Sequence, residues 1–251
     1  MTGPAPWWGE QTLDDDTARS WRIGASQLTA TRRTGEWWLE FVSGTDTDDR
    51  TLELAPMEPV AQRSASTRRY CGAPANQLTL RPVLADRPVV VRPEAPLHVL
   101  PGSSAVLHVS TVVWLSVEAG GRLWEAPLVR PSDTWFGPDT RSGELCYASR
   151  TRARRTPDGL AHPGRAITKI EIENRESTTV ELQRLLLPTH QMAVYERDGQ
   201  LWTDSVVIIR SGGASTDELE LRPLDGPILT PPRDADDHTP IGRVLTALWS
   251  R

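Results

Sequence analysis

The residues best suited to chemistry lie near the middle of the chain. Residues 132–137 read Ser-Asp-Thr-Trp-Phe-Gly, so an aromatic pair, Trp135 and Phe136, lies between two carboxylates, Asp133 and Glu144. Aromatic rings stack on sugars or on protein partners, and two carboxylates in one cleft can act as general acid and general base. The plainer interpretation is a loop stapled by its own side chains, in which Trp135 closes the end of a β-sandwich. A binding site and a structural loop stay equally open, and catalysis is the weakest of the three interpretations.

A run of arginines follows this segment, although the chain as a whole is acidic, with a formal net charge of −5. Arg150, Arg152 and Arg154 alternate, so on a β-strand they would point to one face and could clamp a phosphate or a carboxylate. The alternative is that they form salt bridges with nearby acidic residues. The predicted binding residues lie in this part of the chain and comprise Asp133, Trp135, Phe136, Glu144, Tyr147, Arg150 and Arg152.

Two histidines form a weak metal-binding pattern. His98 and His108 flank a Pro-Gly turn, and a hairpin there can bring both imidazoles to one face, where zinc or copper would bind. A register slip of one residue would separate them, so we favour ordinary half-buried histidines. The acidic runs at 46–49 and 234–238 resemble ligands for a hard cation but lack the glycine and the terminal glutamate of a calcium loop. The sequence therefore predicts no metal ion and no cofactor.

Motifs and composition exclude several classes of protein. The sequence contains no P-loop, no dinucleotide-binding glycine motif, no nucleophile elbow and no H-E-x-x-H zinc motif. The negative charge argues against a surface that coats nucleic acid, and no apolar run is long enough to span a bilayer. The two cysteines, Cys71 and Cys146, exclude a disulfide scaffold. The first ten residues lack a signal-peptide pattern, so we expect a cytoplasmic protein with reduced thiols.

The elements that must position these residues are short β-strands. The 251 residues include 21 prolines and 18 glycines spread along the chain, which disfavours long helices and suits strands joined by turns. Apolar and polar residues alternate with a period of two in segments such as 36–42. We predict an all-β protein, either one β-sandwich or two sandwich-like lobes in tandem. A polar break near residue 86 suggests lobes at 1–86 and 87–225.

Three local patterns predict how the strands are arranged. Trp7-Trp8 and Trp37-Trp38 are adjacent pairs, so one ring of each pair should face the core and the other should face outward. Pro82 interrupts a strand at 78–84, which predicts an edge strand. A Pro-Gly pair at the centre of residues 97–109 fits a type II turn that joins two strands of one hairpin.

Only the C-terminal end has the periodicity of a helix. A linker at 226–238, rich in proline and aspartate, precedes a predicted helix at 239–251, with Thr239 as N-cap and Pro240 as its first residue. A helix of this length is marginal alone in water, so it must dock. It could cover its own sandwich, or it could reach a partner groove or, less well, a membrane surface. Its apolar stripe consists of Ile241, Val244, Leu245, Leu248 and Trp249.

Several segments together carry a pattern that a known family shares. They are residues 132–137 with 143–148, residues 88–92 with 97–102, and Leu187-Pro188 followed by Tyr195. In these segments the chain resembles an archaeal and bacterial family of unknown function, over residues 7–222. Genes of that family are associated with small-conductance mechanosensitive channels, so the resemblance implies an accessory or regulatory subunit. It implies no catalytic residues.

We therefore predict a non-catalytic cytoplasmic β-sandwich protein that binds a protein partner. A mechanosensitive channel is the first candidate, and such a partner would hold the protein at the inner membrane without a span of its own. The alternative is a module that binds a carbohydrate or small molecule through Trp135, Phe136 and an outward tryptophan, which predicts a concave aromatic pocket. An enzyme that uses Asp133 and Glu144 comes third. We predict no nucleic-acid partner, and the oligomeric state stays open.

Overall fold

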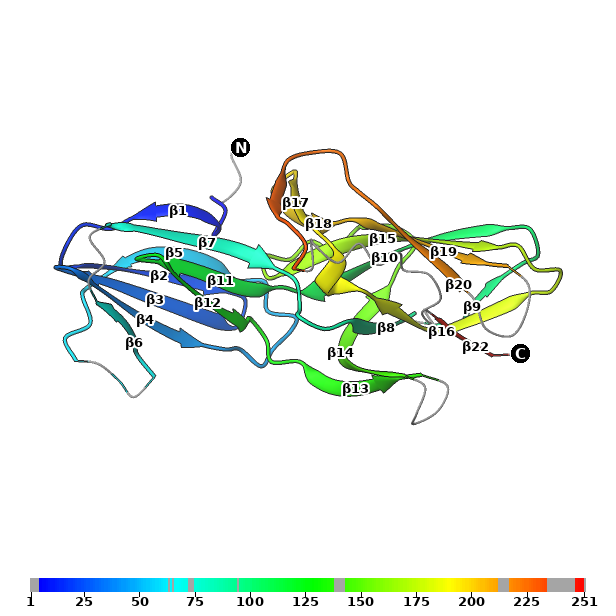
Figure 1. Ribbon diagram of the computed structural model, residues 1–251, viewed down its shortest axis with the longest axis horizontal. Coiled ribbons are helices and arrows are strands. Elements are labelled where there is room, and N and C mark those ends of the chain that lie inside the picture. The colour runs from blue at the N-terminus through cyan, green and yellow to red at the C-terminus, as the bar shows by residue number, and fades with distance from the viewer. Residues whose placement is uncertain are drawn as a thin grey trace. The chain divides into compact units, whose positions relative to one another are not determined.

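The computed structural model describes residues 5–62, 64, 66–71, 75–93, 95–137, 143–211, 217–233 and 247–250. The regular elements in these residues are 22 β-strands and one short 3-10 helix, Thr189–Gln191 (Figure 1). The predicted all-β class is therefore confirmed. Across the same residues, no helix has the length and the apolar character that crossing a membrane requires.

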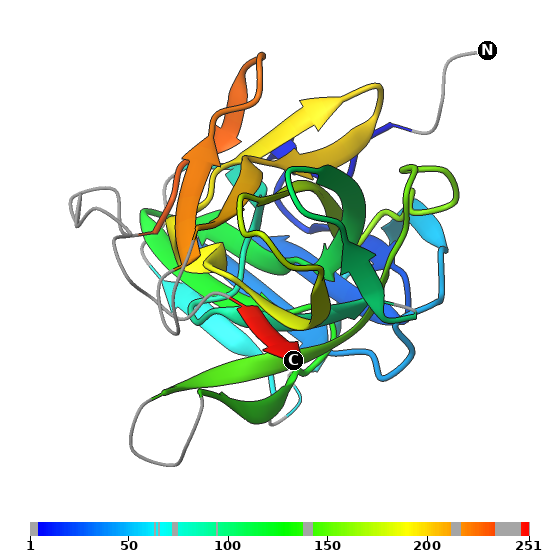
Figure 2. The same ribbon diagram turned by 90° about the vertical axis from the view of Figure 1, so that its right-hand side faces the viewer.

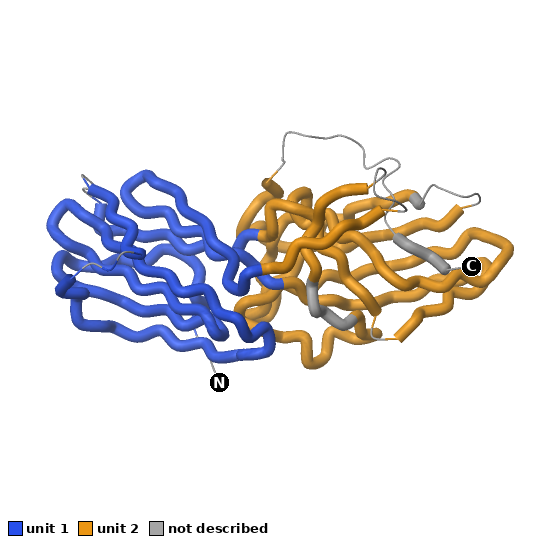
Figure 3. The backbone as a smooth tube through the Cα atoms, turned by 90° about the horizontal axis from the view of Figure 1, so that it is seen from below, with its two compact units in different colours: residues 1–83, 112–130 blue, residues 84–111, 131–251 orange. Residues whose placement is uncertain are grey.

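The chain forms two compact units, each built from two stretches of sequence (Figure 3). Unit 1 comprises Met1–Val83 and Val112–Arg130, and unit 2 comprises Leu84–Thr111 and Pro131–Arg251. The predicted lobes divided the chain once, near residue 86, and placed residues 112–130 in the second lobe. The structure places this segment in unit 1 because its strands pair with a strand of the N-terminal stretch. Such long-range pairing leaves no mark in local composition.

Unit 1 contains two antiparallel sheets that stack on one another (Figure 1). The strand orders are β5-β2-β3-β4-β6 in the five-stranded sheet and β1-β7-β11-β12 in the four-stranded sheet. Inward side chains such as Trp21, Leu28, Leu80 and Leu115, each at most 1% exposed, form the core between them. The strands are β1 (Gly9–Thr12), β2 (Thr17–Ile23), β3 (Ser26–Arg33), β4 (Glu36–Val42), β5 (Leu52–Met57), β6 (Arg68–Cys71), β7 (Gln77–Val83), β11 (Trp114–Ala119) and β12 (Arg122–Pro127).

Tight turns place the hairpins of unit 1 in register. Gly35 joins β3 to β4 with φ +71°, and the pair Gly120-Gly121 joins β11 to β12 with φ 57° and 73°. At Gly120-Gly121 both central residues have positive φ, which is the type I′ geometry that matches the twist of paired strands. Glycine adopts positive φ without steric cost, which is why it suits these turn positions.

The adjacent tryptophans divide between the core and the surface as predicted. Trp37 is fully buried, whereas Trp38, the next residue of β4, is half-buried. Trp7 is likewise fully buried beside a half-buried Trp8, and the two rings meet edge to face with centroids 5.7 Å apart. For Trp37 and Trp38 the reason is the alternation of side chains along a strand.

The prediction that β7 is an edge strand is wrong, because β7 lies between β1 and β11. Its proline is tolerated for a local reason. The pairing with β1 runs from Gln77 to Leu80 and ends there, so Pro82 lies beyond that neighbour. A proline has no N–H to donate, and at this position the β1 ladder does not require one.

Unit 2 contains two mixed sheets. One has the order β20-β19-β15-β18-β17-β21 with β10 paired to β15, and the other has the order β13-β14-β8-β16-β22 with β9 paired to β16. Core residues such as Val91, Ile170, Ile172, Leu185 and Val206 are fully buried. The strands are β8 (Val89–Pro93), β9 (Leu97–Val99), β10 (Ser104–Val112), β13 (Ser132–Phe136), β14 (Glu144–Ala153), β15 (Arg165–Asn174), β16 (Val180–Leu187), β17 (Val194–Arg197), β18 (Gln200–Thr203), β19 (Ser205–Arg210), β20 (Asp217–Arg222), β21 (Ile228–Thr230) and β22 (Ala247–Ser250).

The turn predicted in residues 97–109 exists, but the hairpin does not. The Ser103 N–H donates to the Leu100 carbonyl over 3.2 Å, and Gly102 has φ +65°, as a type II turn requires. The strands on either side pair elsewhere, β9 with β16 and β10 with β15, so the chain passes from one sheet to the other. His98 and His108 therefore lie in different sheets, and the paired-histidine metal site is not formed.

The C-terminal segment differs from the predicted helix. Ala247–Ser250 forms strand β22, which pairs antiparallel with β16 (Figure 2). The prediction of a helix is therefore wrong for Ala247–Ser250, which includes Leu248 and Trp249. Hydrogen bonding to the edge of a sheet outweighs the helical periodicity of the apolar residues there. The other stripe positions, Ile241, Val244 and Leu245, lie outside the described residues.

The predicted linker also contains a strand. Ile228–Thr230 forms β21 and pairs with β17. Arg233 then donates from its backbone N–H to the His190 carbonyl, over 3.0 Å, and from Nε to the Leu84 carbonyl, over 2.8 Å. Residues 226–233 are therefore tied to unit 2, and residues 234–238 lie outside the described part of the chain.

Candidate functional site

The segment in which the sequence placed a binding loop is a β-strand. Ser132–Phe136 forms β13, which pairs antiparallel with β14 (Figures 1 and 2). The ladder sets Asp133 opposite Tyr147, Trp135 opposite Leu145, and Phe136 opposite Glu144. The loop interpretation of residues 132–136 is therefore wrong, because the proline and glycine that flank the segment mark its ends and not its interior.

The strand register separates the two candidate catalytic carboxylates. Directly opposed residues of an antiparallel pair share one face, and successive residues alternate between faces. Asp133 consequently lies on one face of the β13–β14 ribbon, and Glu144 lies on the other. Two carboxylates on opposite faces cannot exchange protons with one substrate. The structure therefore rules out the predicted acid–base pair.

The face that carries Glu144 is part of the core. Phe136 and Cys146 are buried in a cluster with Val90 and Leu186. Burial raises the pKa of the Cys146 thiol to about 12 and raises the pKa of the Glu144 carboxyl above its ordinary value. Cys146 is a free cysteine, and at neutral pH its thiol is protonated and a poor nucleophile. This face packs into the core and stabilises the fold.

The opposite face carries a small polar network and an exposed apolar pair. The Tyr147 hydroxyl donates to an Asp86 carboxylate oxygen over 3.0 Å, and Arg87 pairs with Asp133 at 3.4 Å. Burial and the Asp86 contact both raise the pKa of Tyr147. Trp135 and Leu145 lie side by side beyond this network and are 42% and 47% exposed. These two are the exposed apolar residues of this face, and Asp133 beside them is exposed as well.

The predicted arginine clamp belongs to the C-terminal half of β14 and the residue that follows this strand. Arg150 and Arg152 lie in this strand, but their side chains are outside the described residues. Arg154 follows the strand, forms an isolated bridge with His108, and donates from Nη1 to the Asp158 carbonyl over 3.3 Å. The clamp therefore stays a prediction.

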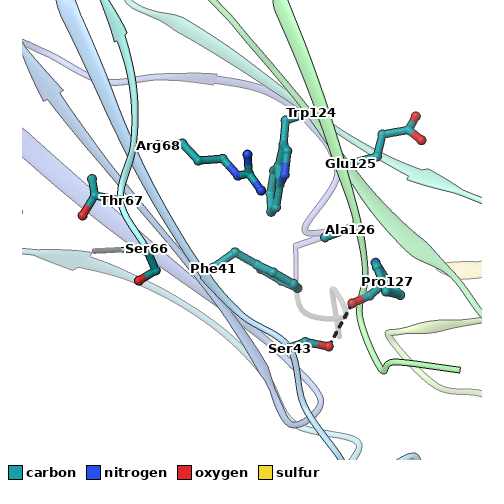
Figure 4. Close-up of a pocket in the computed structure, with 9 residues that line it drawn as sticks. All are labelled: Phe41, Ser43, Ser66, Thr67, Arg68, Trp124, Glu125, Ala126 and Pro127. Carbon is teal, nitrogen blue, oxygen red and sulfur yellow. Dashed lines mark hydrogen bonds between the residues drawn. The ribbon is translucent and has the colours of Figure 1, made fainter. Parts of the chain in front are cut away.

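The described residues contain a concave aromatic site at a different place, in unit 1 (Figure 4). A cleft of about 560 Å³ opens beside β12, along the ends of β4 and β6. Its size falls in the range of small-molecule sites. The residues that line it are Phe41, Ser43, Ser66, Thr67, Arg68, Trp124, Glu125, Ala126 and Pro127.

Strand register explains why three of these side chains converge. Each lies directly opposite a buried residue of the neighbouring strand, so each faces the space between the two sheets. The pairs are Phe41 with Leu28, Arg68 with Leu39, and Trp124 with Val117. Because β6 and β12 are the last strands of their sheets, this inner space is open to solvent on their side.

The cleft combines an aromatic wall with a positive charge. The Phe41 and Trp124 rings meet edge to face with centroids 5.3 Å apart, and the Arg68 guanidinium carbon lies 4.9 Å from the centre of the Trp124 ring. Within the described residues, Arg68 has no carboxylate partner. The Glu125 carboxylate lines the same cleft but points away from Arg68 (Figure 4). An apolar surface next to an available guanidinium is suited to an organic anion.

Sequence reasoning missed these residues, and their local signal was weak. Phe41 and Trp124 occupy inward positions of alternating strands, where an aromatic side chain normally fills the core. Their exposure arises because the strands that carry or flank them are at sheet edges, and edge position depends on pairing. The sequence predicted a concave aromatic pocket as one alternative, but at another place. The cleft contains none of the predicted binding residues.

Metal binding finds no geometric support in the part of the chain that the structure describes. No group of three or more histidine, cysteine or acidic residues there is arranged to hold an ion. In the run at 46–49, Asp46 accepts a hydrogen bond from the Asp48 N–H, and Asp49 accepts one from the Thr51 N–H, both at 2.9 Å. These carboxylates shape the loop by local hydrogen bonds.

Fold and site together define a two-unit all-β protein with an aromatic, cationic cleft in its first unit. The family described as Protein of unknown function (DUF432) matches residues 7–238, and the chain belongs to this family. No curated protein and no solved structure matches the chain. Membership of a family of unknown function is thus confirmed, and the match extends past residue 222. The family description assigns no activity, so function has to be argued from the site.

Proposed function

We propose that this protein is a non-catalytic binding protein and that the cleft of unit 1 is its ligand site. The observation that carries this proposal is the convergence of Phe41, Trp124 and Arg68 in one open cleft. Aromatic rings bury the apolar part of a ligand, and a few polar groups at the rim set its orientation. A carbohydrate or another small polar molecule is the class of ligand that this combination favours.

The site is better suited to binding than to catalysis. The cationic group of the lining is a guanidinium, a type of group that does not act as an acid or base in proteins. Thr67 donates its hydroxyl hydrogen to Glu40, and Ser43 donates its own to backbone carbonyls. Glu125 points away from the aromatic wall (Figure 4). The lining therefore supplies recognition without an evident nucleophile and base pair.

A ligand screen observed through the indole N–H signals tests this proposal. The chain contains ten tryptophans, and their indole signals in a ¹H–¹⁵N spectrum report on separate places in the fold. We expect at least one compound in a library of sugars and small organic acids to shift the Trp124 signal in a saturable manner. Trp124→Phe assigns that signal.

Two matched variants decide where binding occurs. Phe41→Ala should abolish the shift, and Trp135→Ala, which removes an exposed aromatic side chain in unit 2, should leave it unchanged. Thermal unfolding of both variants confirms that they are folded. If no compound shifts the Trp124 signal, or if Phe41→Ala binds as well as the wild type, the cleft is not the ligand site.

We propose as a second function that the protein binds a protein partner through Trp135 and Leu145. The observation that favours it is the exposed apolar pair on an otherwise polar face of the β13–β14 ribbon. The predicted identity of the partner, a mechanosensitive channel, follows only from the resemblance, as does a cytoplasmic location at the inner membrane.

A direct binding measurement tests the second function. Purified small-conductance channel in detergent should bind the full-length protein, and Trp135→Ser should weaken this binding. Leu123→Ser is the matched control, because Leu123 is an exposed leucine, with 62% exposure, and belongs to β12 in unit 1. Equal binding of all three proteins would show that the Trp135–Leu145 pair is not the contact.

A further inference from the structure

We propose that the ligand of the unit 1 cleft is an acidic sugar, a pyranose that carries a carboxylate. This inference rests on the proposed function of the cleft and adds the chemistry of its ligand. In the proposed complex the carboxylate pairs with Arg68, the ring packs against Phe41 and Trp124, and a ligand hydroxyl donates to Ser43. Each of these three contacts follows from a separate observation.

Arg68 supplies the anion contact. Its guanidinium carbon lies 4.9 Å from the centre of the Trp124 ring, and the group has no carboxylate partner among the described residues, so its N–H donors are available to a ligand. The neighbouring Arg69 is different, because it donates from Nε to a Glu36 carboxylate oxygen over 2.7 Å and also pairs with it through Nη2. Of these two adjacent arginines, only Arg68 has its charge available to a ligand within the described residues.

The charge of the cleft favours a carboxylate over a phosphate. Arg68 is the only cationic residue among the described residues that line it. A single planar guanidinium matches one carboxylate in a two-point contact. Phosphate sites instead gather several backbone N–H groups or more than one positive charge. We therefore commit to a carboxylate, and a sugar phosphate becomes an arm of the test.

The aromatic wall requires a ligand with an apolar face. Phe41 and Trp124 meet edge to face, and Figure 4 shows the Phe41 ring between the Arg68 guanidinium and the Ser43 hydroxyl. A ligand that reaches from Arg68 to Ser43 therefore passes over Phe41. The C–H face of a pyranose is flat and apolar, whereas its rim is polar, which suits this sequence of contacts.

Ser43 requires a ligand that donates a hydrogen bond. A hydroxyl has one hydrogen and two acceptor lone pairs. The Ser43 hydrogen is already directed at the Pro127 and Leu128 carbonyls, both 3.1 Å away, so the oxygen can only accept from a ligand. Sugar hydroxyls are donors, whereas a simple aromatic acid has none to offer. A ring with both hydroxyls and a carboxylate satisfies Ser43 and Arg68 together.

A matched pair of ligands tests the inference on the full-length protein. Methyl glucuronide and methyl glucoside share a pyranose ring and differ in one position, which is a carboxylate in the first and a CH₂OH group in the second. We expect the glucuronide to shift the Trp124 indole signal and to bind at least about tenfold more tightly than the glucoside, as a charge-assisted contact implies. Glucose 6-phosphate is the third ligand and should bind more weakly than the glucuronide.

Two arginine variants complete the test. Arg68→Gln should remove the preference for the glucuronide, and Arg69→Gln should retain it, because Arg69 is already paired with Glu36. The unchanged remainder of the ¹H–¹⁵N spectrum confirms that both variants are folded. A preserved preference in Arg68→Gln, or tighter binding of the phosphate, would overturn the assignment of the carboxylate to Arg68.

The test separates failure of this inference from failure of the proposed function. If the glucoside binds as tightly as the glucuronide and still shifts Trp124, the cleft is a ligand site but its ligand is not an acidic sugar. If neither sugar shifts Trp124 while other compounds of the library do, the inference is again overturned and the site stands. If no compound at all shifts Trp124, both proposals are wrong.

Discussion

At the scale of single residues, two buried tryptophans differ in one hydrogen bond. Trp21 and Trp37 are both fully buried in unit 1. The Trp37 indole N–H donates to the Ala75 carbonyl over 3.2 Å, whereas the Trp21 indole N–H has no hydrogen-bond partner within the described residues. A buried donor without a partner is destabilising, and a satisfied one contributes about 1 kcal/mol.

Replacing each of these tryptophans by phenylalanine tests the difference. Both changes remove the same ring volume, but Trp37→Phe also removes a hydrogen bond, and Trp21→Phe removes an unsatisfied donor. We expect Trp37→Phe to lower the free energy of unfolding by about 1 kcal/mol more than Trp21→Phe does. Urea denaturation of the two variants measures this, and an equal loss would contradict the assignment of the hydrogen bond.

The contribution of Glu36 to the stability of the fold depends on pH. Hydrogen bonds from Arg69 and Trp38 lower the pKa of Glu36 from 4.5 to about 2. A carboxyl with a lowered pKa in the folded state stabilises the protein above pH 4.5, and this contribution disappears as the pH falls towards 2. Because Glu36 lies at the surface, solvent screening keeps the contribution small.

We expect the stability of Glu36→Gln to depend less on pH than the stability of the wild type does. Between pH 4.5 and pH 2 the wild type should lose stability more steeply than the variant, so the two urea midpoints should converge at low pH. Glu125→Gln serves as a control carboxyl of unit 1 on the neighbouring sheet. A wild type and a Glu36→Gln variant with parallel profiles would contradict the shift.

At the scale of elements, pairing partners decide what a segment becomes. Residues 132–136 carry the composition of a loop, yet the ladder with β14 makes them a strand and divides Asp133 from Glu144. The C-terminal residues carry a helical stripe, yet Ala247–Ser250 forms a strand on β16. Local propensity is a weak guide wherever a sheet edge is available to pair with.

Removal of residues 247–251 tests the C-terminal strand. The pairing of β22 covers β16 from Glu181 to Leu185, so its loss would expose the backbone groups of β16 that face it. Amide hydrogen exchange in this part of β16 should become faster, while exchange in β2, β3 and β4 of unit 1 stays unchanged. Unchanged exchange in β16 would show that β22 does not pair there in solution.

At the scale of the whole molecule, the chain crosses between units three times. Unit 1 is completed only by residues 112–130, whose strands β11 and β12 supply half of its four-stranded sheet. A fragment that stops near residue 86 has β1 and β7 alone on that side of its core. Two strands bury too little apolar surface to cover the five-stranded sheet.

Two fragments distinguish a contiguous lobe from the interrupted unit. Residues 1–86 should show no cooperative thermal unfolding. Residues 1–83 joined to residues 112–130 by a short glycine linker should unfold cooperatively, because Val83 pairs directly with Trp114 and the two ends are adjacent. Circular dichroism during heating measures both. Cooperative unfolding of the shorter fragment would show that β11 and β12 are dispensable.

The candidate site was predictable in its type of chemistry and unpredictable in its position. The sequence predicted a concave aromatic pocket as one alternative, but it placed that pocket at Trp135 and Phe136. The alternation of β4 places Phe41 on the inner face, and that is as far as local pattern extends. Arg68 is 27 residues from Phe41 along the chain, and Trp124 is 83 residues from Phe41 and belongs to the other sheet. No local stretch of sequence therefore contains the three residues together.

Features that depend on neighbouring residues were predictable from the sequence. Four features depend on residues within a few positions of one another. They are the all-β class, the glycine turns at Gly35 and Gly120-Gly121, the type II turn at Gly102, and the burial of Trp37 next to a half-buried Trp38. The tertiary structure alone decided that β9 and β10 join different sheets, that β11 returns to β7, and that Asp133 and Glu144 face apart. The physical reason is that backbone hydrogen bonds between strands are the same for every residue type, so the choice of partner is made by the packing of the whole core.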